Sequence, residues 1–394
     1  MAIKILIGGS PCTYWSIAKT NNRETKAEGM GWELFKNYLI AKEKFKPDFF
    51  LYENNKSASQ AIKDQIAEEF GVGVDPDVRF TYINSALVSA QNRQRFYVTN
   101  FGDIEQPKDR GILLKDILET GQGQRNQDKA RTLTAGYTCK SQRDLRKDIE
   151  TDGFMGAQGV IEPVNPTIEG KAHTLTAPYY KIAENPFSTF GNEKGRQRIF
   201  EKVCDYGATP CEWDENGKPT KAISCADGKT YTVYEAKDGQ ITIKGKQYPI
   251  KLSDGYYIIR KLTVRECARL QTMPDDYCKA VSDSQAYKAL GNGWTAEVII
   301  HLLNHALKDV PRDEEIIVLS LYDGIATGRY CLDKMGFTNV KYHAYEIDKY
   351  PIMVAMDNYP DIIQHGDAFA VREDDWKPPQ TRSEWLDELL GGGR

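Results

Sequence analysis

Short apolar runs alternate with longer amphipathic segments along this chain. The runs have the length and residue content of buried parallel strands, and they cover residues 3–7, 48–52, 80–88, 316–321, 340–345 and 362–365. Apolar residues recur at helical spacing in segments between them, which cover residues 32–45, 58–70, 296–303 and 329–335. Strands that alternate with helices predict an α/β protein built on a doubly wound parallel sheet.

Residues 107–254 follow a different pattern. Their periodicity weakens, glycine, threonine and short β-like pieces dominate, and the stretches 214–217 and 238–239 are typical of hairpin turns. We therefore expect a smaller β-rich domain at residues 107–254. It would be inserted between the two parts of a main domain, at residues 1–106 and 255–394.

A helical pattern returns at residues 260–277. Thr263 has the side chain and position of an N-cap, and Glu266, three residues later, completes a capping box. Pro274 is expected to end this helix.

Composition narrows the class of protein. The chain has 394 residues and 40% hydrophobic residues, enough for two domains and a sizeable core. Its eight cysteines form no CxxC pair, which argues against a structural zinc site and a disulfide framework. No apolar run reaches membrane-spanning length and the first residues are not a signal peptide, so we expect a cytoplasmic protein. The net charge of −4 gives no overall basic signal, so nucleic-acid binding would need a local positive surface.

Chemically useful side chains stand where two predicted strands end. The first strand ends in Gly8 and Gly9, Pro11 fixes the turn, and Cys12 stands at its tip. The second strand runs into Glu53. Because ligands bind at the carboxyl ends of strands in open α/β sheets, Cys12 is a candidate nucleophile. The alternatives are a small buried thiol in a turn and a surface acid at a strand end.

Arg93 and Arg95 lie two residues apart on an extended segment. Side chains at that spacing point the same way, so the two guanidinium groups are predicted to share one face. The alternative is a pair of charges on a solvated strand edge.

A strand, a glycine-rich turn and a helix follow one another near the end of the chain. The strand at residues 316–321 runs into the turn at residues 322–328. The next strand ends in Glu346, about twenty residues past the turn, where an acid can accept a ribose hydroxyl. A third strand ends at Asp367. The turn lacks the dinucleotide pattern GxGxxG, so it favours a smaller nucleoside cofactor than NAD.

The motifs at these positions together resemble one known family. They read GGSPC ending at Cys12, YENN around Glu53, QNRQR across Arg93 and Arg95, RKLTVRECARLQTMPDDY at 260–277, AYKALGN before Trp294, and SLYDGIATG at 320–328. In this combination the chain closely resembles the DNA (cytosine-5) methyltransferases, everywhere except residues 107–254.

The order of the motifs departs from that family. In the usual order the cofactor turn precedes the proline–cysteine turn, whereas here the Cys12 segment opens the chain and the Asp323 segment nearly closes it. We interpret this as a circular permutation, which a cut in a surface loop between adjacent strands allows. It leads us to expect the strand before Asp367 close to the strand at residues 3–7. Smaller departures from the family's usual residues occur at Thr13, Asn55, Gly293 and Tyr322.

The resemblance implies a fold and a reaction. The fold is a Rossmann-like S-adenosylmethionine-dependent methyltransferase sheet, and the reaction is site-specific methylation of cytosine C5 in DNA. Cys12 would add to C6 as a thiolate, and Glu53 would protonate or hydrogen-bond N3. Arg95 would hold the O2 side of the base, with Arg93 supporting it. S-adenosylmethionine would supply the methyl group and leave as S-adenosylhomocysteine.

The resemblance also implies which residues bind the cofactor. Tyr322 would stack near the adenine, the backbone of the turn that follows would cradle the methionine part, Glu346 would accept the ribose hydroxyls, and Trp294 would cover the cofactor. The remaining cofactor residues that it implies are Asp323, Gly324, Ala326, Thr327, Gly328, Asn292, Thr295, Ile347 and Asp367.

A base inside a duplex cannot reach such a site, so the target cytosine would be flipped out. Residues 14–30 would close behind it as a lid, and the inserted domain would read sequence in the major groove. The DNA contacts that we expect are Ser16, Arg23, Thr263, Arg143, Lys147 and Arg196.

Two rival interpretations stay open. RNA methylation uses the same chemistry, although the tRNA enzyme of this family usually lacks so large an inserted domain. A catalytically dead DNA-binding homologue is disfavoured by the presence together of Cys12, Glu53 and Arg95. We expect a monomer from a bacterial or phage-infected cell, with duplex DNA as its partner and no membrane contact. A cognate restriction endonuclease is a partner that fits this class.

Overall fold

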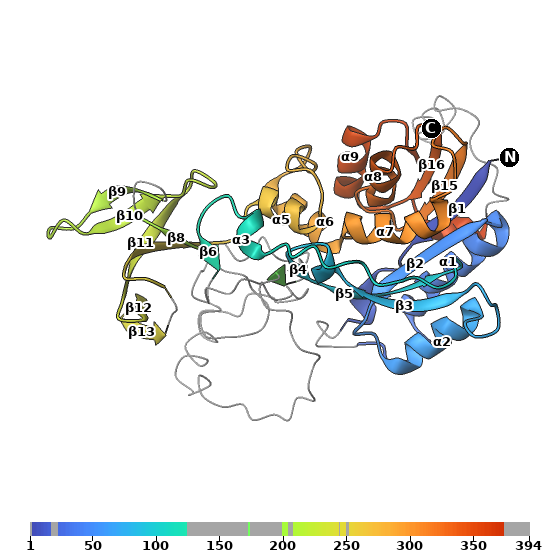
Figure 1. Ribbon diagram of the computed structural model, residues 1–394, viewed down its shortest axis with the longest axis horizontal. Helices are drawn as coiled ribbons and strands as arrows, with labels where there is room; N and C mark the ends of the chain where they lie inside the picture. The colour runs from blue at the N-terminus through green and yellow to red at the C-terminus, as the bar shows by residue number, and fades with distance from the viewer. Residues whose placement is uncertain are drawn as a thin grey trace, which may run out of the picture.

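A seven-stranded sheet organises the larger part of the molecule (Figure 1). The computed structural model describes residues 2–16, 23–123, 172–173, 199–203, 208–243, 245–249 and 252–373. The order across the sheet is β17-β16-β15-β1-β2-β5-β3, and β5 runs antiparallel to both of its neighbours whereas the other pairs are parallel. The strands are β1 (Ile3–Gly8), β2 (Phe49–Asn55), β3 (Arg79–Asn84), β5 (Gln94–Thr99), β15 (Ile316–Leu321), β16 (Val340–Tyr345) and β17 (Ile363–Gln364).

Helices cover both faces of this sheet. Successive residues of β1 point to opposite faces: Ile5 and Ile7 lie in one core cluster and Leu6 lies in the other. The first cluster includes residues of α5 (Val264–Leu270), α6 (Asp283–Asn292), α7 (Ala296–Leu307), α8 (Thr327–Lys334) and α9 (Lys349–Asn358). The second includes residues of α1 (Met30–Phe45) and α2 (Gln60–Phe70). The expected α/β sheet with helices on both faces is confirmed, but the sheet is mixed rather than wholly parallel, because β5 runs antiparallel to β2 and β3.

The order of strands places β1 beside β15, although most of the sequence separates the two. β1 pairs with β15 along its whole length and with β2 on its other side. The expectation that the strand before Asp367 lies close to β1 is wrong, because β16 and β15 separate β17 from β1. The reason is the reversal of strand order at β15, from which the sheet grows outward in both directions.

A second, antiparallel sheet extends from the first (Figure 1). It has the order β13-β12-β11-β14-β8-β6, with β10 on β11 and β9 on β10. Its hairpins turn at residues 214–217 and 238–239, as predicted. Its strands are β6 (Gln122–Gly123), β8 (Ile199–Lys202), β9 (Thr209–Trp213), β10 (Pro219–Ile223), β11 (Thr230–Lys237), β12 (Gln240–Ile243), β13 (Lys246–Pro249) and β14 (Gly255–Arg260).

The connection between the two sheets does not follow the predicted boundaries. β14 pairs with β11 and β8 of the second sheet, although its residues were assigned to the main domain. Conversely, Leu114 and Ile117 of α3 (Leu114–Ile117), assigned to the inserted domain, lie in the main core cluster. The predicted helix begins directly after its N-cap Thr263, as expected, and spans Val264–Leu270. It ends before Pro274, which was expected to end it, and Arg260, at the start of the helical pattern, is the last residue of β14.

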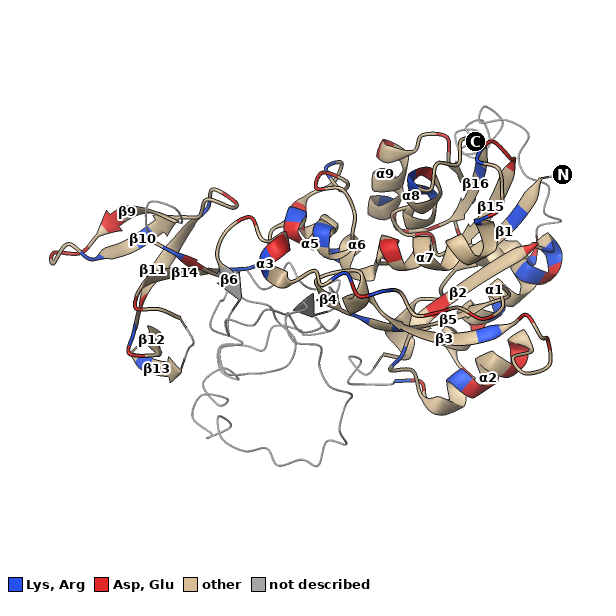
Figure 2. Cartoon of the chain, in the orientation of Figure 1, with Lys and Arg blue, Asp and Glu red and all other residues tan. Residues whose placement is uncertain are grey.

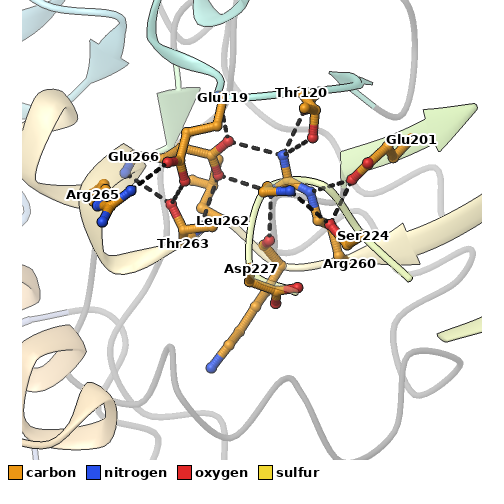
Figure 3. A network of polar contacts seen from close by, with 12 residues as sticks. Glu119, Thr120, Glu201, Ser224, Asp227, Arg260, Leu262, Thr263, Arg265 and Glu266 are labelled. Atoms are coloured by element: carbon orange, nitrogen blue, oxygen red, sulfur yellow. Dashed lines mark hydrogen bonds and ion pairs between the residues drawn. The ribbon is translucent and has the colours of Figure 1, made fainter. Parts of the chain in front are cut away.

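Arg260 ties the two sheets together through buried ion pairs (Figure 3). From the end of β14 its guanidinium donates to Glu266 on α5 at 2.9 Å and to Glu201 on β8 at 3.2 Å. All three side chains have no solvent exposure. Glu266 also completes the predicted capping box with Thr263, which is confirmed. The junction is therefore a closed polar network rather than an open linker.

Charges of both signs are mixed over the described part of the chain. Figure 2 shows Lys and Arg interspersed with Asp and Glu, both on the helices of the larger part and on the strands of the second sheet. Within the same residues, no helix is long and apolar enough to cross a membrane.

Candidate active site

A cleft of about 1130 Å³ opens at the carboxyl ends of the parallel strands. Residues that follow or end β1, β2, β15, β16 and β17 all line it, as expected for an open α/β sheet. Its volume is sufficient for a nucleoside cofactor and a second planar group together. The residues expected to act in catalysis are all present in its lining, namely Cys12, Glu53, Arg93 and Arg95.

Hydrogen bonds from β2 fix the turn that carries Cys12. Ser10 and Tyr52 share a hydrogen bond between their hydroxyl groups at 2.8 Å. The Asn54 amide donates to the Ser10 carbonyl oxygen at 2.9 Å and to the Tyr52 hydroxyl at 3.1 Å. Gly9 lets the turn approach closely, because a Cβ atom there would lie 3.1 Å from Glu53 Oε2 and closer still to the Glu53 carbonyl oxygen. Cys12 then begins a short 3₁₀ turn, η1 (Cys12–Tyr14).

Two donors hold the Glu53 carboxylate. Arg95 Nε contacts Oε1 at 2.9 Å, and the Trp294 indole N–H donates to Oε2 at 3.0 Å. Glu53 is 9% exposed, so both contacts lie in a largely desolvated setting where charge-assisted hydrogen bonds are strong. The interpretation of Glu53 as a surface acid is wrong.

Arg93 holds the segment that carries Trp294. It is 3% exposed and donates to the carbonyl oxygens of Gly291 at 3.3 Å and Gly293 at 2.9 Å. Gly291 lies in the last turn of α6 and Gly293 is its C-cap, directly before Trp294. Arg93 and Arg95 are both buried, so the alternative of a solvated strand edge is also wrong.

The groups around Cys12 shift the pKa of its thiol in opposite directions. Burial raises the pKa of the Cys12 thiol, the guanidinium of Arg95 lowers it, and the carboxylate of Glu53 raises it again. The net direction is upward, so the thiol is protonated at neutral pH.

The turn after β15 curls tightly at the other end of the cleft. Tyr322, Gly324 and Ala326 all have left-handed backbone angles, with φ of 59°, 64° and 59°. Such conformations are unfavourable for residues other than glycine and concentrate at functional sites. The curl turns the Gly324 N–H toward Glu346, whose Oε2 accepts from it at 2.9 Å. The turn and the acid at the end of β16 therefore form one wall of the cleft.

This end of the cleft fits a nucleoside cofactor. Glu346 and Asp367 offer carboxylate acceptors at adjacent strand ends, and Ile347 exposes an apolar side chain beside them, 72% accessible. Asp323 is held by the hydroxyls of Ser320 and Tyr342, each at 2.7 Å, while its Oδ2 is buried without a partner. Burial raises the pKa of Asp323 to about 6. Apolar surface next to acceptors for hydroxyl and amino groups is the lining that a ribose and a base require.

The structure places some expected residues away from the cleft lining. Thr295 is 2% exposed, and its hydroxyl bonds Gln271 and Ser85. Gly328 packs α8 against β1, because a Cβ atom there would collide with Ile7. Ala326 is fully buried within the turn that it helps to shape. The expected cofactor residues that do line the cleft are Tyr322, Asp323, Gly324, Thr327, Glu346, Ile347, Asp367, Asn292 and Trp294.

The expected DNA-contacting residues also include some that line the cleft and some that do not. Ser16 lines the cleft, whereas Arg23 donates to the carbonyl oxygens of Trp15 and Ser57. Thr263 lies in the junction network, where its hydroxyl donates to Glu119 at 2.7 Å. The remaining contacts, Arg143, Lys147 and Arg196, lie outside the described residues.

Sequence reasoning missed the hydrogen-bonded support of the Cys12 turn by Ser10, Tyr52 and Asn54. The signal was present, since Tyr52 and Asn54 flank Glu53 at alternate strand positions and therefore point to the opposite face from it.

Comparisons with known proteins agree with this geometry. The model of the C-5 cytosine-specific DNA methylase family matches residues 1–308. The type II methyltransferase M.BanI of Aneurinibacillus aneurinilyticus is 52% identical over 40 residues, covering 10% of this chain and 9% of that protein. The type II methyltransferase M.SsoII of Shigella sonnei is 25% identical over 299 residues, covering 75% and 62%. The chain thus spans less than two thirds of the length of either relative.

Among solved structures, that of the Entamoeba histolytica methyltransferase EhMeth aligns with 78% of each chain at 13% identity, with a TM-score of 0.38, too low to support an argument. The family assignment rests on the model match, which covers well over half of the sequence. This chain belongs to the C-5 cytosine-specific DNA methylase family.

Proposed function

We propose that this protein methylates C5 of cytosine in duplex DNA, using S-adenosylmethionine as methyl donor. The observation that carries the proposal is the convergence of Cys12, Glu53 and Arg95 in one cleft that continues to Glu346 and Asp367. A nucleophile, an acid and a nucleoside pocket are the parts that this reaction needs, and the family match is independent of that geometry.

The side chains would act in a fixed order. The Cys12 thiolate forms a bond to C6 of the flipped base, and Glu53 provides a proton or hydrogen bond to N3, so that electron density collects at C5. The bound donor supplies a methyl group on a positively charged sulfur. The bond from C5 to the methyl group would form as the carbon–sulfur bond of the donor breaks, so that S-adenosylhomocysteine leaves with a neutral sulfur. A base would then take the C5 proton, the C5–C6 double bond would re-form, the bond to Cys12 would break, and N3 would return any proton to Glu53. The thiolate is regenerated, so atoms and charge balance.

We also propose that the chain is circularly permuted relative to its family. The family match ends at residue 308, before β15, β16 and β17, which carry the nucleoside end of the cleft. These strands nevertheless belong to the same sheet as β1, and β15 pairs with it directly. A permutation that cuts the connection from the β17 side to β1 would leave this packing unchanged.

The second sheet is the proposed reader of DNA sequence. It extends away from the cleft and is held to the main sheet by Arg260, as a recognition module must be if it is to place the base. Duplex DNA is therefore the proposed substrate, and flipping gives the base access to Cys12. The expected monomer and the restriction partner remain predictions.

Transfer of tritium from labelled donor tests this function. The protein is incubated with genomic DNA or with bulk tRNA, and label in DNA alone is expected. Label in tRNA alone would mean that RNA, and not DNA, is the substrate. Label in neither would reject the proposal that the protein is a methyltransferase. Cys12→Ser should retain donor binding and transfer nothing. Bisulfite sequencing of the same DNA then reads the methylated motif.

A further inference from the structure

Trp294 connects the two ends of the cleft. Its indole N–H donates to Glu53 at the base end, and its ring lines the cleft that extends to the nucleoside end. It lies between α6 and α7, on the segment that starts with Gly293. A Cβ atom on Gly293 would lie 3.6 Å from Ile325 in the turn after β15. The tryptophan segment therefore contacts the wall that is proposed to bind the cofactor.

The segment that carries Trp294 is held from several sides. Arg93 and Gln271 both donate to the Gly293 carbonyl oxygen, at 2.9 Å and 3.3 Å. Gln271 also donates to the Leu290 carbonyl oxygen at 2.6 Å. The indole thus approaches Glu53 from a fixed backbone, and the hydrogen bond is not the chance contact of a mobile surface side chain.

The carboxylate needs this second donor. With Arg95 alone on Oε1, the Glu53 carboxyl could rotate about its last side-chain bond, because such terminal torsions are broad. With Trp294 on Oε2 as well, the plane of the carboxyl group is set by two donors from different elements. A planar base presents its ring edge in one plane, so the orientation of the carboxyl decides whether it meets N3.

We propose that Trp294 is a positioning residue that sets the plane of the Glu53 carboxyl for the flipped base and couples this to cofactor binding. The inference rests on the proposed function of the cleft and deepens it. A cofactor lying against the indole orders the ring, and the ordered ring orders the acid. The donor site thereby prepares the base site before the base arrives.

The variant Trp294→Phe separates the two parts of this role, because it keeps an aromatic ring and removes the N–H donor. Two quantities are measured: the dissociation constant of S-adenosylhomocysteine by calorimetry, and the single-turnover rate of methyl transfer to one long PCR duplex at saturating donor. We expect the dissociation constant to stay within about twofold. The rate should fall by about 10- to 100-fold, the usual effect of losing a hydrogen bond to a charged group.

Trp294→Ala is the matched control, because it removes ring and donor together. It should lower the rate as Trp294→Phe does and weaken binding of S-adenosylhomocysteine in addition. If Trp294→Phe raises the dissociation constant and leaves the rate unchanged, the indole serves the cofactor alone and the inference is overturned.

A double-mutant cycle with Glu53→Gln tests whether the tryptophan acts through the acid. If it does, Trp294→Phe should slow the Glu53→Gln protein by no more than about twofold, because the contact is already altered. Independent, multiplying effects would reject the positioning role. The same cycle is measured in thermal unfolding temperatures, where the double variant should lose less than the sum of the single losses.

The unfolding cycle also separates this inference from the proposed function. If the wild-type protein labels neither DNA nor tRNA, the proposed function fails, and the unfolding data alone decide whether the two side chains are coupled. If the wild type is active and the single-turnover rate of Trp294→Phe is unchanged, the function stands and the inference fails.

Discussion

Replacing Arg260 with methionine should destabilise the junction more than any other single change in it. The guanidinium is fully buried and makes a bidentate pair with Glu266, a contact with Glu201, and bonds to the Lys261 and Thr120 carbonyl oxygens. Without it, two fully buried carboxylates face each other with no cation between them. Removing one partner of a buried ion pair costs about 3–5 kcal/mol.

That loss is a large part of the stability of a typical protein, which is about 5–15 kcal/mol. Each carboxylate keeps other donors: Glu266 accepts from two backbone N–H groups, and Glu201 accepts from the Ser224 hydroxyl and the Cys225 N–H. These bonds moderate the cost but add no positive charge. With a urea m-value of about 2–3 kcal/mol per molar, the midpoint of unfolding should fall by about 1–2 M.

The assay is urea unfolding of the full chain, followed by far-ultraviolet circular dichroism. Glu201→Gln is the matched control, because it removes one of the two negative charges and leaves the bidentate Arg260–Glu266 pair intact. It should cost only about 1 kcal/mol, the net value of one hydrogen bond. The reasoning is refuted if Arg260→Met unfolds within about 1 kcal/mol of the wild type, or if Glu201→Gln costs as much as Arg260→Met.

Three further predictions concern the cleft. Arg95 lowers and Glu53 raises the pKa of Cys12. Alkylation of Cys12 by iodoacetamide at slightly alkaline pH, followed by mass spectrometry, should therefore be faster in Glu53→Gln and slower in Arg95→Leu. Alkylation rates that change in the same direction in both variants would contradict this. Asp323 has a pKa raised by burial from 3.8 to about 6, so wild-type stability falls as pH rises through this window. Asp323→Asn should therefore gain about 1–3 kcal/mol in urea unfolding above pH 6, a gain that disappears as pH falls toward 3.8; an equal gain at both pH values would count against it. Gly9→Ala should reduce methyl transfer at least tenfold, since its Cβ would press on the Glu53 backbone, while S-adenosylhomocysteine binding by calorimetry stays unchanged; weakened binding with an unchanged rate would refute this.

The elements that depend on local pattern could be predicted from the sequence. Each predicted buried run contains a strand of the main sheet, whereas β5 lies in a segment that was predicted only as extended. Thr263 and Glu266 form the capping box that their spacing predicts. The Cys12 turn and Glu53 line one cleft, because strand ends of a parallel sheet share an edge. For these features, the neighbours that decide the structure lie within a few residues in the chain.

What the sequence did not reveal depends on contacts between distant residues. Trp294 and Glu53 are 241 positions apart, and Arg93 reaches the Gly293 carbonyl oxygen across 200 positions. No periodicity encodes such pairs. Arg260 opens the segment with helical spacing but precedes the predicted N-cap, and the pattern did not show that it ends β14 and pairs with Ile199 of β8.

β1 shows how one strand can serve both halves of the cleft. It lies between β15 and β2, and its last residue, Gly8, and the next residue, Gly9, face opposite neighbours. A Cβ atom on Gly8 would lie 2.6 Å from the Leu321 carbonyl oxygen of β15, whereas one on Gly9 would press on Glu53 of β2. Each glycine therefore permits close approach to a different half of the site. The thiol that follows them is placed by β15 and β2 together, although these strands are separated by most of the chain. Such placement depends on which strands are neighbours and not on the order in which the chain visits them, so the proposed permutation is compatible with an assembled site.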